Sequence, residues 1–190
     1  MRSLLYLHGF RSSPVSFKAR CLQQYFAQRS ESHRFICPQL PPSPREAFAL
    51  VKQLVHDRPA DEFAVIGSSL GGFYATAIAE ASGCRAVLLN PAVWPARDLA
   101  KYIGEQTAWH STDRFFFRPE FIDELQDLTV ARITQPQRYF LIAATGDELL
   151  DWREMTARYA GANQQVIQGS DHGLSDFEQY LDQVVSFCER

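Results

Sequence analysis

Short apolar runs alternate with longer amphipathic stretches from one end of the chain to the other. The apolar runs predict β-strands at residues 4–7, 34–37, 63–66, 85–89, 138–144 and 165–168. The amphipathic stretches predict helices at residues 14–29, 46–56, 73–81, 152–159 and 176–189. Several strands are apolar at nearly every position, which is typical of strands covered on both faces. The alternation therefore predicts an α/β protein with a mostly parallel sheet of about six strands and helices on both faces.

This rhythm breaks over residues 93–137, a segment too long for a simple turn. It contains Trp94, Trp109 and the triplet 115–117 of phenylalanines, and residues 119–128 predict a short helix. Two interpretations stay open. The segment is either a connecting helical excursion that packs on the sheet, or a cap over an active site whose aromatic side chains line an acyl pocket.

Composition restricts the class of protein. At 190 residues, with 46% hydrophobic and 22% charged residues, the chain fits one globular domain, residues 1–190, with 93–137 as a candidate cap insertion. A net charge of −3 gives no reason to expect nucleic acid or an anionic membrane as a partner. No apolar run approaches the roughly 20 residues of a membrane helix. The short apolar N-terminus is unlike a signal peptide, so we expect a cytoplasmic protein.

The four cysteines are far apart in the sequence and form no Cys-x-x-Cys pair. Their spacing argues against a zinc site and against a disulfide scaffold, and it favours buried free thiols. No group of histidine, aspartate and glutamate has the spacing of metal ligands. We therefore expect no metal.

The motif Gly67-Ser68-Ser69-Leu70-Gly71-Gly72 lies between an apolar strand and an alanine-rich helix. Strand, tight glycine turn and helix form the context in which Gly-x-Ser-x-Gly is a nucleophile elbow, with Ser69 at its centre. The glycines at 67 and 71 are required because a side chain there would collide with the neighbouring strand or helix. The motif lacks the glycine spacing of a dinucleotide site and the Gly-Lys-Ser/Thr ending of a phosphate loop, so we expect no cofactor.

Three polar residues follow the carboxyl ends of predicted strands, namely Ser69, Asp147 and His172. In an open parallel sheet these ends meet at one edge, where ligands bind. Serine, aspartate and histidine in this order along the chain are typical of an α/β-hydrolase. Histidine activates the weakly nucleophilic serine hydroxyl, and a buried carboxylate fixes the tautomer of the histidine.

Other residues compete for two of these roles. Asp151 and Asp171 are alternative acids, but Asp151 falls within the next predicted helix, and the side chains of the neighbours Asp171 and His172 diverge. Asp147 is therefore the better candidate. His8 is interpreted as a structural residue of the loop after the first strand. The remaining histidines have no partner motif and are expected at the surface: His33, His56 and His110.

The reaction also needs two backbone N–H groups that stabilise the oxyanion. One is expected from Leu70, directly after the nucleophile. The other is expected from the loop after the first strand, where the N–H of Phe10 is the candidate.

These motifs, taken together, resemble the α/β-hydrolase superfamily, and within it the small bacterial YqiA-like esterases. The matching segments are residues 4–10, 38–42, 67–72, 90–92, 145–148 and 171–172. The resemblance covers nearly the whole chain and is weakest over residues 94–137. It implies esterase activity on acyl esters, including acyl-thioesters, with Ser69, Asp147 and His172 carried over by motif.

Our hypothesis from the sequence is a serine esterase that acts through an acyl-enzyme intermediate on a small-molecule acyl ester or thioester. Two alternatives stay open. The same triad serves an acyl-CoA thioesterase or an amidase, and a hydrolase fold also occurs in binding proteins that have lost catalysis. Nothing in the sequence specifies an oligomeric state.

Overall fold

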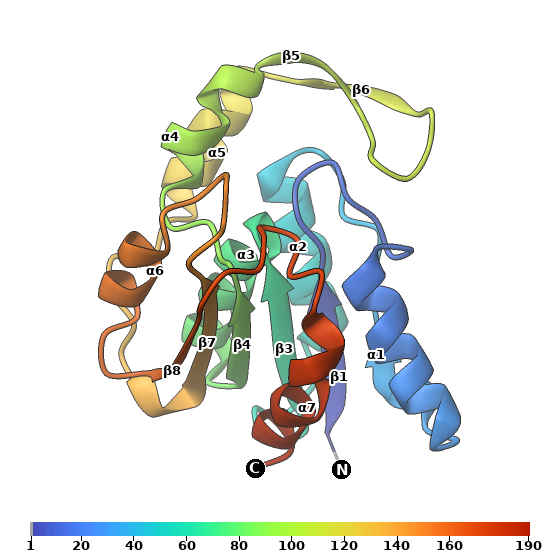
Figure 1. Ribbon diagram of the computed structural model, residues 1–190. Coiled ribbons are helices and arrows are strands. Elements are labelled where there is room, and N and C mark those ends of the chain that lie inside the picture. The colour runs from blue at the N-terminus through green and yellow to red at the C-terminus, as the bar shows by residue number, and fades with distance from the viewer. Residues whose placement is uncertain (1) are drawn as a thin grey trace.

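The computed structural model describes residues 2–190, and its centre is a six-stranded sheet in the order β2-β1-β3-β4-β7-β8 (Figure 1). Every neighbouring pair of strands in this sheet is parallel. The strands are β1 (Ser3–Leu7), β2 (Phe35–Ile36), β3 (Phe63–Ser68), β4 (Arg85–Leu89), β7 (Tyr139–Ala144) and β8 (Asn163–Ile167). The parallel sheet predicted from the sequence is confirmed.

Helices cover both faces of the sheet, as the apolar strands require. The main helices are α1 (Phe17–Gln28), α2 (Pro44–Val55), α3 (Leu70–Ser82), α6 (Trp152–Arg158) and α7 (Leu181–Glu189). Short 3-10 turns are η1 (Ser32–Arg34), η2 (Ala100–Tyr102), η3 (Pro136–Arg138) and η4 (Phe177–Tyr180). None of the helices in residues 2–190 is both long enough and apolar enough to cross a bilayer.

The side chains of successive strand residues enter two separate hydrophobic clusters, because they point to opposite faces of the sheet. Leu4 and Tyr6 of β1 join a cluster with α1 and α7, whereas Leu5 and Leu7 join a cluster with α2, α3 and α6. All four side chains are buried. The two clusters hold the central strands rigidly, so their carboxyl ends form a fixed platform for the loops that follow.

The segment between β4 and β7 is not purely helical. It contains α4 (Pro95–Leu99), an antiparallel hairpin of β5 (Gly104–Thr107) and β6 (Arg114–Phe117), and α5 (Glu120–Asp127). The hairpin was not predicted. In β6, Phe117 points into the core whereas Phe116 is 58% exposed. This alternation is typical of a strand, but three identical residues in a row do not reveal it in the sequence. The hairpin and both helices lie beyond the carboxyl ends of the strands (Figure 1).

Candidate active site

Ser69 lies on the sharp turn between β3 and α3. Its backbone has φ 55° and ψ −121°, a conformation that costs about 1–3 kcal/mol in a non-glycine residue. Two backbone hydrogen bonds hold it there: its N–H donates to the carbonyl of Leu89 (3.0 Å), and its carbonyl accepts from the N–H of Ala92 (3.0 Å). The turn therefore keeps the Ser69 side chain above the end of the sheet.

The glycines of this turn are required by close backbone packing. A Cβ atom on Gly67 would lie 2.2 Å from the carbonyl oxygen of Gly71, and a Cβ on Gly71 would lie 1.9 Å from the carbonyl oxygen of Leu7. Both contacts are with backbone atoms, which cannot move aside as a flexible side chain does. The predicted need for glycine at both positions follows from this geometry.

Three of the predicted site residues form one hydrogen-bonded chain. The Nε2 atom of His172 lies 2.9 Å from the Ser69 hydroxyl, and Nδ1 of His172 lies 2.8 Å from Oδ2 of Asp147. The other oxygen of Asp147 accepts hydrogen bonds from the N–H groups of Leu149 (2.9 Å) and Leu150 (2.8 Å). A carboxylate only accepts, so Nδ1 of His172 carries the proton and Nε2 is free to accept from Ser69.

The structure separates Asp147 from the two competing acids. Asp151 caps α6 through a hydrogen bond from the N–H of Arg153 (2.9 Å). Asp171 accepts a hydrogen bond from the N–H of Ser175 (2.8 Å). Within residues 2–190, Asp147 is the carboxylate bonded to the His172 ring, and its side chain is fully buried.

Two backbone N–H groups beside Ser69 are free to bind a ligand. In the described part of the chain, neither Phe10 nor Leu70 donates its N–H to a protein acceptor. Both residues line the same cleft as Ser69. Leu70 is the first residue of α3, where N–H groups have no partner within the helix. These are the two donors that the sequence predicted for an oxyanion.

His8 has the structural environment expected for it. Its Nδ1 atom donates to the carbonyl of Gly9 (3.0 Å), and Nε2 accepts from the N–H of Leu40 (3.0 Å). Burial lowers the pKa of this histidine, which keeps the ring neutral. His8 thereby fastens the loop that carries Phe10 to the proline-rich loop. The other three predicted surface histidines are exposed: His33, His56 and His110.

Asn90 is a site residue that the sequence analysis missed. It is fully buried with φ 42°. Its side-chain NH₂ donates to the carbonyls of Asp171 (3.0 Å) and His172 (3.1 Å), and its side-chain oxygen accepts from the N–H of Ala144 (2.8 Å). Glu148 adds a fourth bond by accepting the N–H of His172 (2.9 Å). The available indication was position, since Asn90, like Ser69, directly follows a strand.

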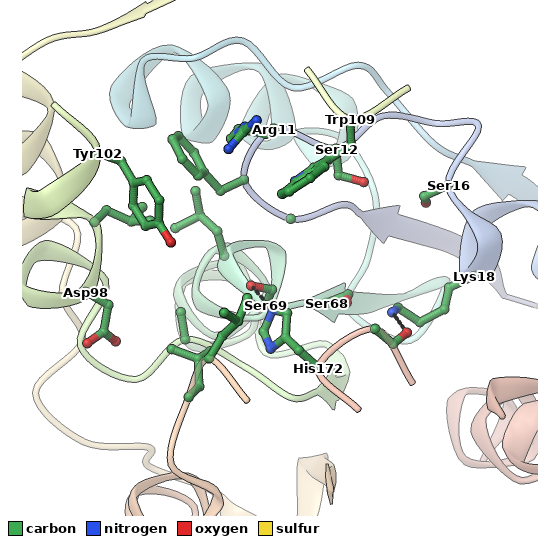
Figure 2. Close-up of a pocket in the computed structure, with 18 of the residues that line it drawn as sticks. Arg11, Ser12, Ser16, Lys18, Ser68, Ser69, Asp98, Tyr102, Trp109 and His172 are labelled. Carbon is green, nitrogen blue, oxygen red and sulfur yellow. Dashed lines mark hydrogen bonds between the residues drawn. The ribbon is translucent and has the colours of Figure 1, made fainter. Parts of the chain in front are cut away.

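A cleft of about 570 Å³ opens beside Ser69, a size typical of small-molecule sites. Figure 2 shows Asp98 and Tyr102 on one side of Ser69, and Ser16 and Lys18 on the other. The first side carries the Asp98 carboxylate and the Tyr102 ring, and the lining of the cleft also includes the apolar residues Ala92, Leu99, Leu149 and Leu150. The second side carries the polar residues Ser12, Ser16, Lys18 and Ser68 together with the Trp109 ring, and Arg11 lies above Ser69 in this view.

The aromatic residues of the segment between β4 and β7 are divided between the cleft and the core. Trp109 lines the cleft, but the phenylalanine triplet does not. Phe117 is fully buried and packs against Phe10, with ring centroids 5.1 Å apart, and Phe115 contacts the same ring at 5.9 Å. These two rings therefore support the Phe10 loop from behind, and Trp109 is the aromatic residue of this segment, besides Tyr102, that lines the cleft.

The cysteines are all free thiols. Cys21, Cys84 and Cys188 are buried, and Cys37 is half-buried. Burial raises the pKa of Cys84 to about 11 and that of Cys37 to about 12, so both are protonated at neutral pH. Among residues 2–190, no cluster of three or more histidine, cysteine, aspartate or glutamate side chains is arranged to hold a metal ion.

The fold and the arrangement of loops at its carboxyl edge define an α/β-hydrolase-fold protein. The family model described as Uncharacterised protein family (UPF0227) matches residues 3–189, and the chain belongs to this family. The result confirms the YqiA-like resemblance drawn from the sequence motifs.

Solved structures with the same fold are similar over nearly the whole chain. Alpha/beta hydrolase domain-containing protein 10 from mouse has 17% identity and a TM-score of 0.70, covering 97% of this chain and 89% of that chain. A structure of the metagenome-derived lipolytic enzymes LipS and LipT has 17% identity and a TM-score of 0.72, covering 98% of this chain and 92% of that chain. Est1E from Butyrivibrio proteoclasticus, with ferulic acid bound, has 14% identity and a TM-score of 0.68, covering 100% and 87%. At these identities the similarity establishes the fold.

Proposed function

We propose that the protein is a serine esterase that hydrolyses small-molecule carboxylic esters through an acyl-enzyme intermediate. The observation that carries this proposal is the hydrogen-bonded chain from Ser69 through His172 to Asp147, with distances of 2.9 and 2.8 Å. Serine next to a histidine that is oriented by a buried carboxylate is the arrangement that makes a hydroxyl nucleophilic.

In the first step, the Ser69 hydroxyl oxygen attacks the carbonyl carbon of the ester while Nε2 of His172 takes its proton. The carbonyl oxygen becomes an oxyanion, which the free N–H groups of Phe10 and Leu70 stabilise. His172 then gives the proton to the leaving oxygen, and the carbon–oxygen bond of the ester breaks. In the second step, water takes the place of the alcohol, with His172 as its base, and the acid leaves Ser69.

The lining of the cleft suits the acyl part of an ester. The apolar part of the lining, which includes Leu99 and Leu150, provides a surface for an acyl chain. Solved structures with the same fold include lipolytic enzymes and Est1E bound to ferulic acid. Their names favour ester bonds over amide bonds as the target of this chain.

Replacement of Ser69 by alanine tests the proposal. We expect Ser69→Ala to reduce kcat for p-nitrophenyl butyrate by about 10⁴-fold or more while the circular dichroism spectrum stays unchanged. The matched control is Ser82→Ala at the other end of α3, where the hydroxyl bonds only within the helix and its turn. Turnover by Ser69→Ala that equals wild type would refute the assignment.

Substrate class is tested with a panel of oxygen esters, acyl-CoA thioesters and anilides of one acyl chain. The proposal predicts the highest kcat/KM for the oxygen esters. A higher kcat/KM for the acyl-CoA or for the anilide would instead identify a thioesterase or an amidase that uses the same three residues.

A further inference from the structure

Lys18 is a buried cation that forms no direct ion pair among residues 2–190. Its residue is only 8% exposed, and its ammonium group donates to the carbonyl of Gly173, directly after His172 in the chain. In the part of the chain that the structure describes, no carboxylate lies within ion-pair distance of it. Burial lowers the pKa of Lys18 to about 8, which still leaves most of the lysine charged at pH 7. The carboxylates of Asp171 and Asp147 lie near enough to favour the charged form of Lys18, but neither is in ion-pair contact with it. A buried charge without a direct counter-ion is costly, so its presence needs an explanation.

Ser16 adds an unused hydrogen-bonding group to the same wall of the cleft. It is 8% exposed, and its hydroxyl has no hydrogen-bond partner among residues 2–190. Ser16 is the N-cap of α1, yet its side chain does not cap the helix. The buried residue Tyr6 lines the same cleft, and its hydroxyl lies near the hydroxyls of Ser16 and Ser68.

The N-terminus of α1 contributes further donors. α1 is a helix of 12 residues. Within residues 2–190, the N–H groups of Phe17, Lys18 and Ala19 donate to no protein acceptor. Ser16, Phe17 and Lys18 all line the cleft that holds Ser69. Free N–H groups and the dipole of a helix N-terminus attract anions.

The position of this wall relates it to one part of the substrate. Lys18 is bonded to the residue that follows His172, and His172 donates the proton to the leaving group in the proposed mechanism. Figure 2 shows Ser16 and Lys18 on the opposite side of Ser69 from Asp98 and Tyr102. Lys18 and Ser16 thus lie on the side of the cleft next to the loop that carries His172, the residue that protonates the leaving group in the proposed mechanism.

We propose that Lys18, Ser16 and the N-terminus of α1 form a subsite for an anion, a carboxylate or a phosphate, on the leaving group of the ester. The assignment of this anion to the leaving group rests on the proposed esterase function, whereas the existence of the anion site does not. A cation, a hydroxyl and free N–H groups together match the charge and the several acceptor oxygens of such an anion.

The first test compares two butyrate esters, those of 3-hydroxybenzoate and 3-hydroxybenzamide, which differ in charge at one position of the leaving group. Wild type is expected to prefer the anionic ester in kcat/KM. We expect Lys18→Met to reduce this preference about 10- to 100-fold, because a hydrogen bond to a charged group is worth about 1.5–3 kcal/mol, and Ser16→Ala to reduce it several-fold. The matched control is Lys52→Met, an exposed lysine on α2, which leaves the preference unchanged. No preference in wild type, or an equal preference in Lys18→Met, overturns the inference.

The second test measures binding without turnover. Isothermal titration calorimetry with 3-hydroxybenzoate and with phenyl phosphate, on the Ser69→Ala variant, is expected to show binding that Lys18→Met in the same background weakens at least tenfold. The relative affinities of the two ligands distinguish carboxylate from phosphate. Binding without any esterase activity in wild type would support the anion site and refute the proposed function. Hydrolysis of the neutral ester without anion binding would refute the anion site alone.

Discussion

Asn90→Asp is a small change with a large expected effect, because the side-chain NH₂ of Asn90 holds the His172 loop in place. The NH₂ donates to the carbonyls of Asp171 and His172, at 3.0 and 3.1 Å. Aspartate has almost the same shape, but it places an oxygen opposite both carbonyl oxygens. The acceptor that binds the N–H of Ala144 is kept, so the substitution removes only the link to the loop.

The size of the expected loss of stability follows from the complete burial of Asn90. Two net hydrogen bonds are lost, and a carboxyl group is placed at a fully buried position. Together these effects are expected to lower the free energy of unfolding by about 3–5 kcal/mol. For a chain of this length, that corresponds to a fall in Tm of about 6–20 °C. The freed loop displaces His172 from Ser69, so kcat is expected to fall about 10- to 100-fold.

The assay measures Tm by circular dichroism, and kcat and KM for p-nitrophenyl butyrate at a temperature where the variant is fully folded. Asn163→Asp is the matched control, because Asn163 is exposed and has one long hydrogen bond of 3.4 Å. A folded Asn90→Asp protein with wild-type kcat would show that the His172 loop does not depend on Asn90 and would refute the reasoning.

Three further predictions concern the elbow, the loop and the buried lysine. Gly71→Ala is expected to lower the free energy of unfolding in urea by about 3 kcal/mol or more, because its Cβ would lie 1.9 Å from the carbonyl oxygen of Leu7; near wild-type stability would contradict this. Glu148→Ala removes the acceptor of the His172 N–H and is expected to lower kcat a few-fold, whereas Glu148→Gln retains it; equal kcat in both variants would contradict the role. The pKa of Lys18 falls from 10.5 in the unfolded chain to about 8 in the folded protein, so the unfolded state binds more protons between these values. Wild type is therefore expected to gain on the order of 3 kcal/mol over Lys18→Met as pH rises from 8 to 10.5, and parallel stability–pH curves for the two proteins would contradict the shift.

The elements of the sheet and three polar residues at its edge were predictable because local patterns determine them. An apolar run predicts a buried strand, and a polar residue directly after it lies at the carboxyl edge. Ser69 had the added indication of glycines on both sides, which the backbone contacts of Gly67 and Gly71 explain. Asp147 and His172 came from their positions after strands, from their order along the chain and from motif resemblance, and the structure brings both into one hydrogen-bonded chain.

Residues whose role depends on distant contacts were not predictable. Asn90 appeared to be an ordinary turn residue, because its three partners come from β7 and from the loop after β8. The burial of Lys18 depends on the placement of α1 against the His172 loop, and lysine in a helix is ordinarily exposed. The hairpin was missed because three adjacent phenylalanines show no alternation in hydrophobicity, although their side chains alternate in burial.

Trapping of the nucleophile tests the central claim most directly. Wild-type protein is treated with a fluorophosphonate, and the modified peptide is identified by mass spectrometry, with the Ser69→Ala and Ser82→Ala variants alongside. The account predicts one adduct on Ser69, its loss in Ser69→Ala, and its retention in Ser82→Ala. An adduct on another residue, or an active wild-type protein that forms no adduct at Ser69, would contradict it.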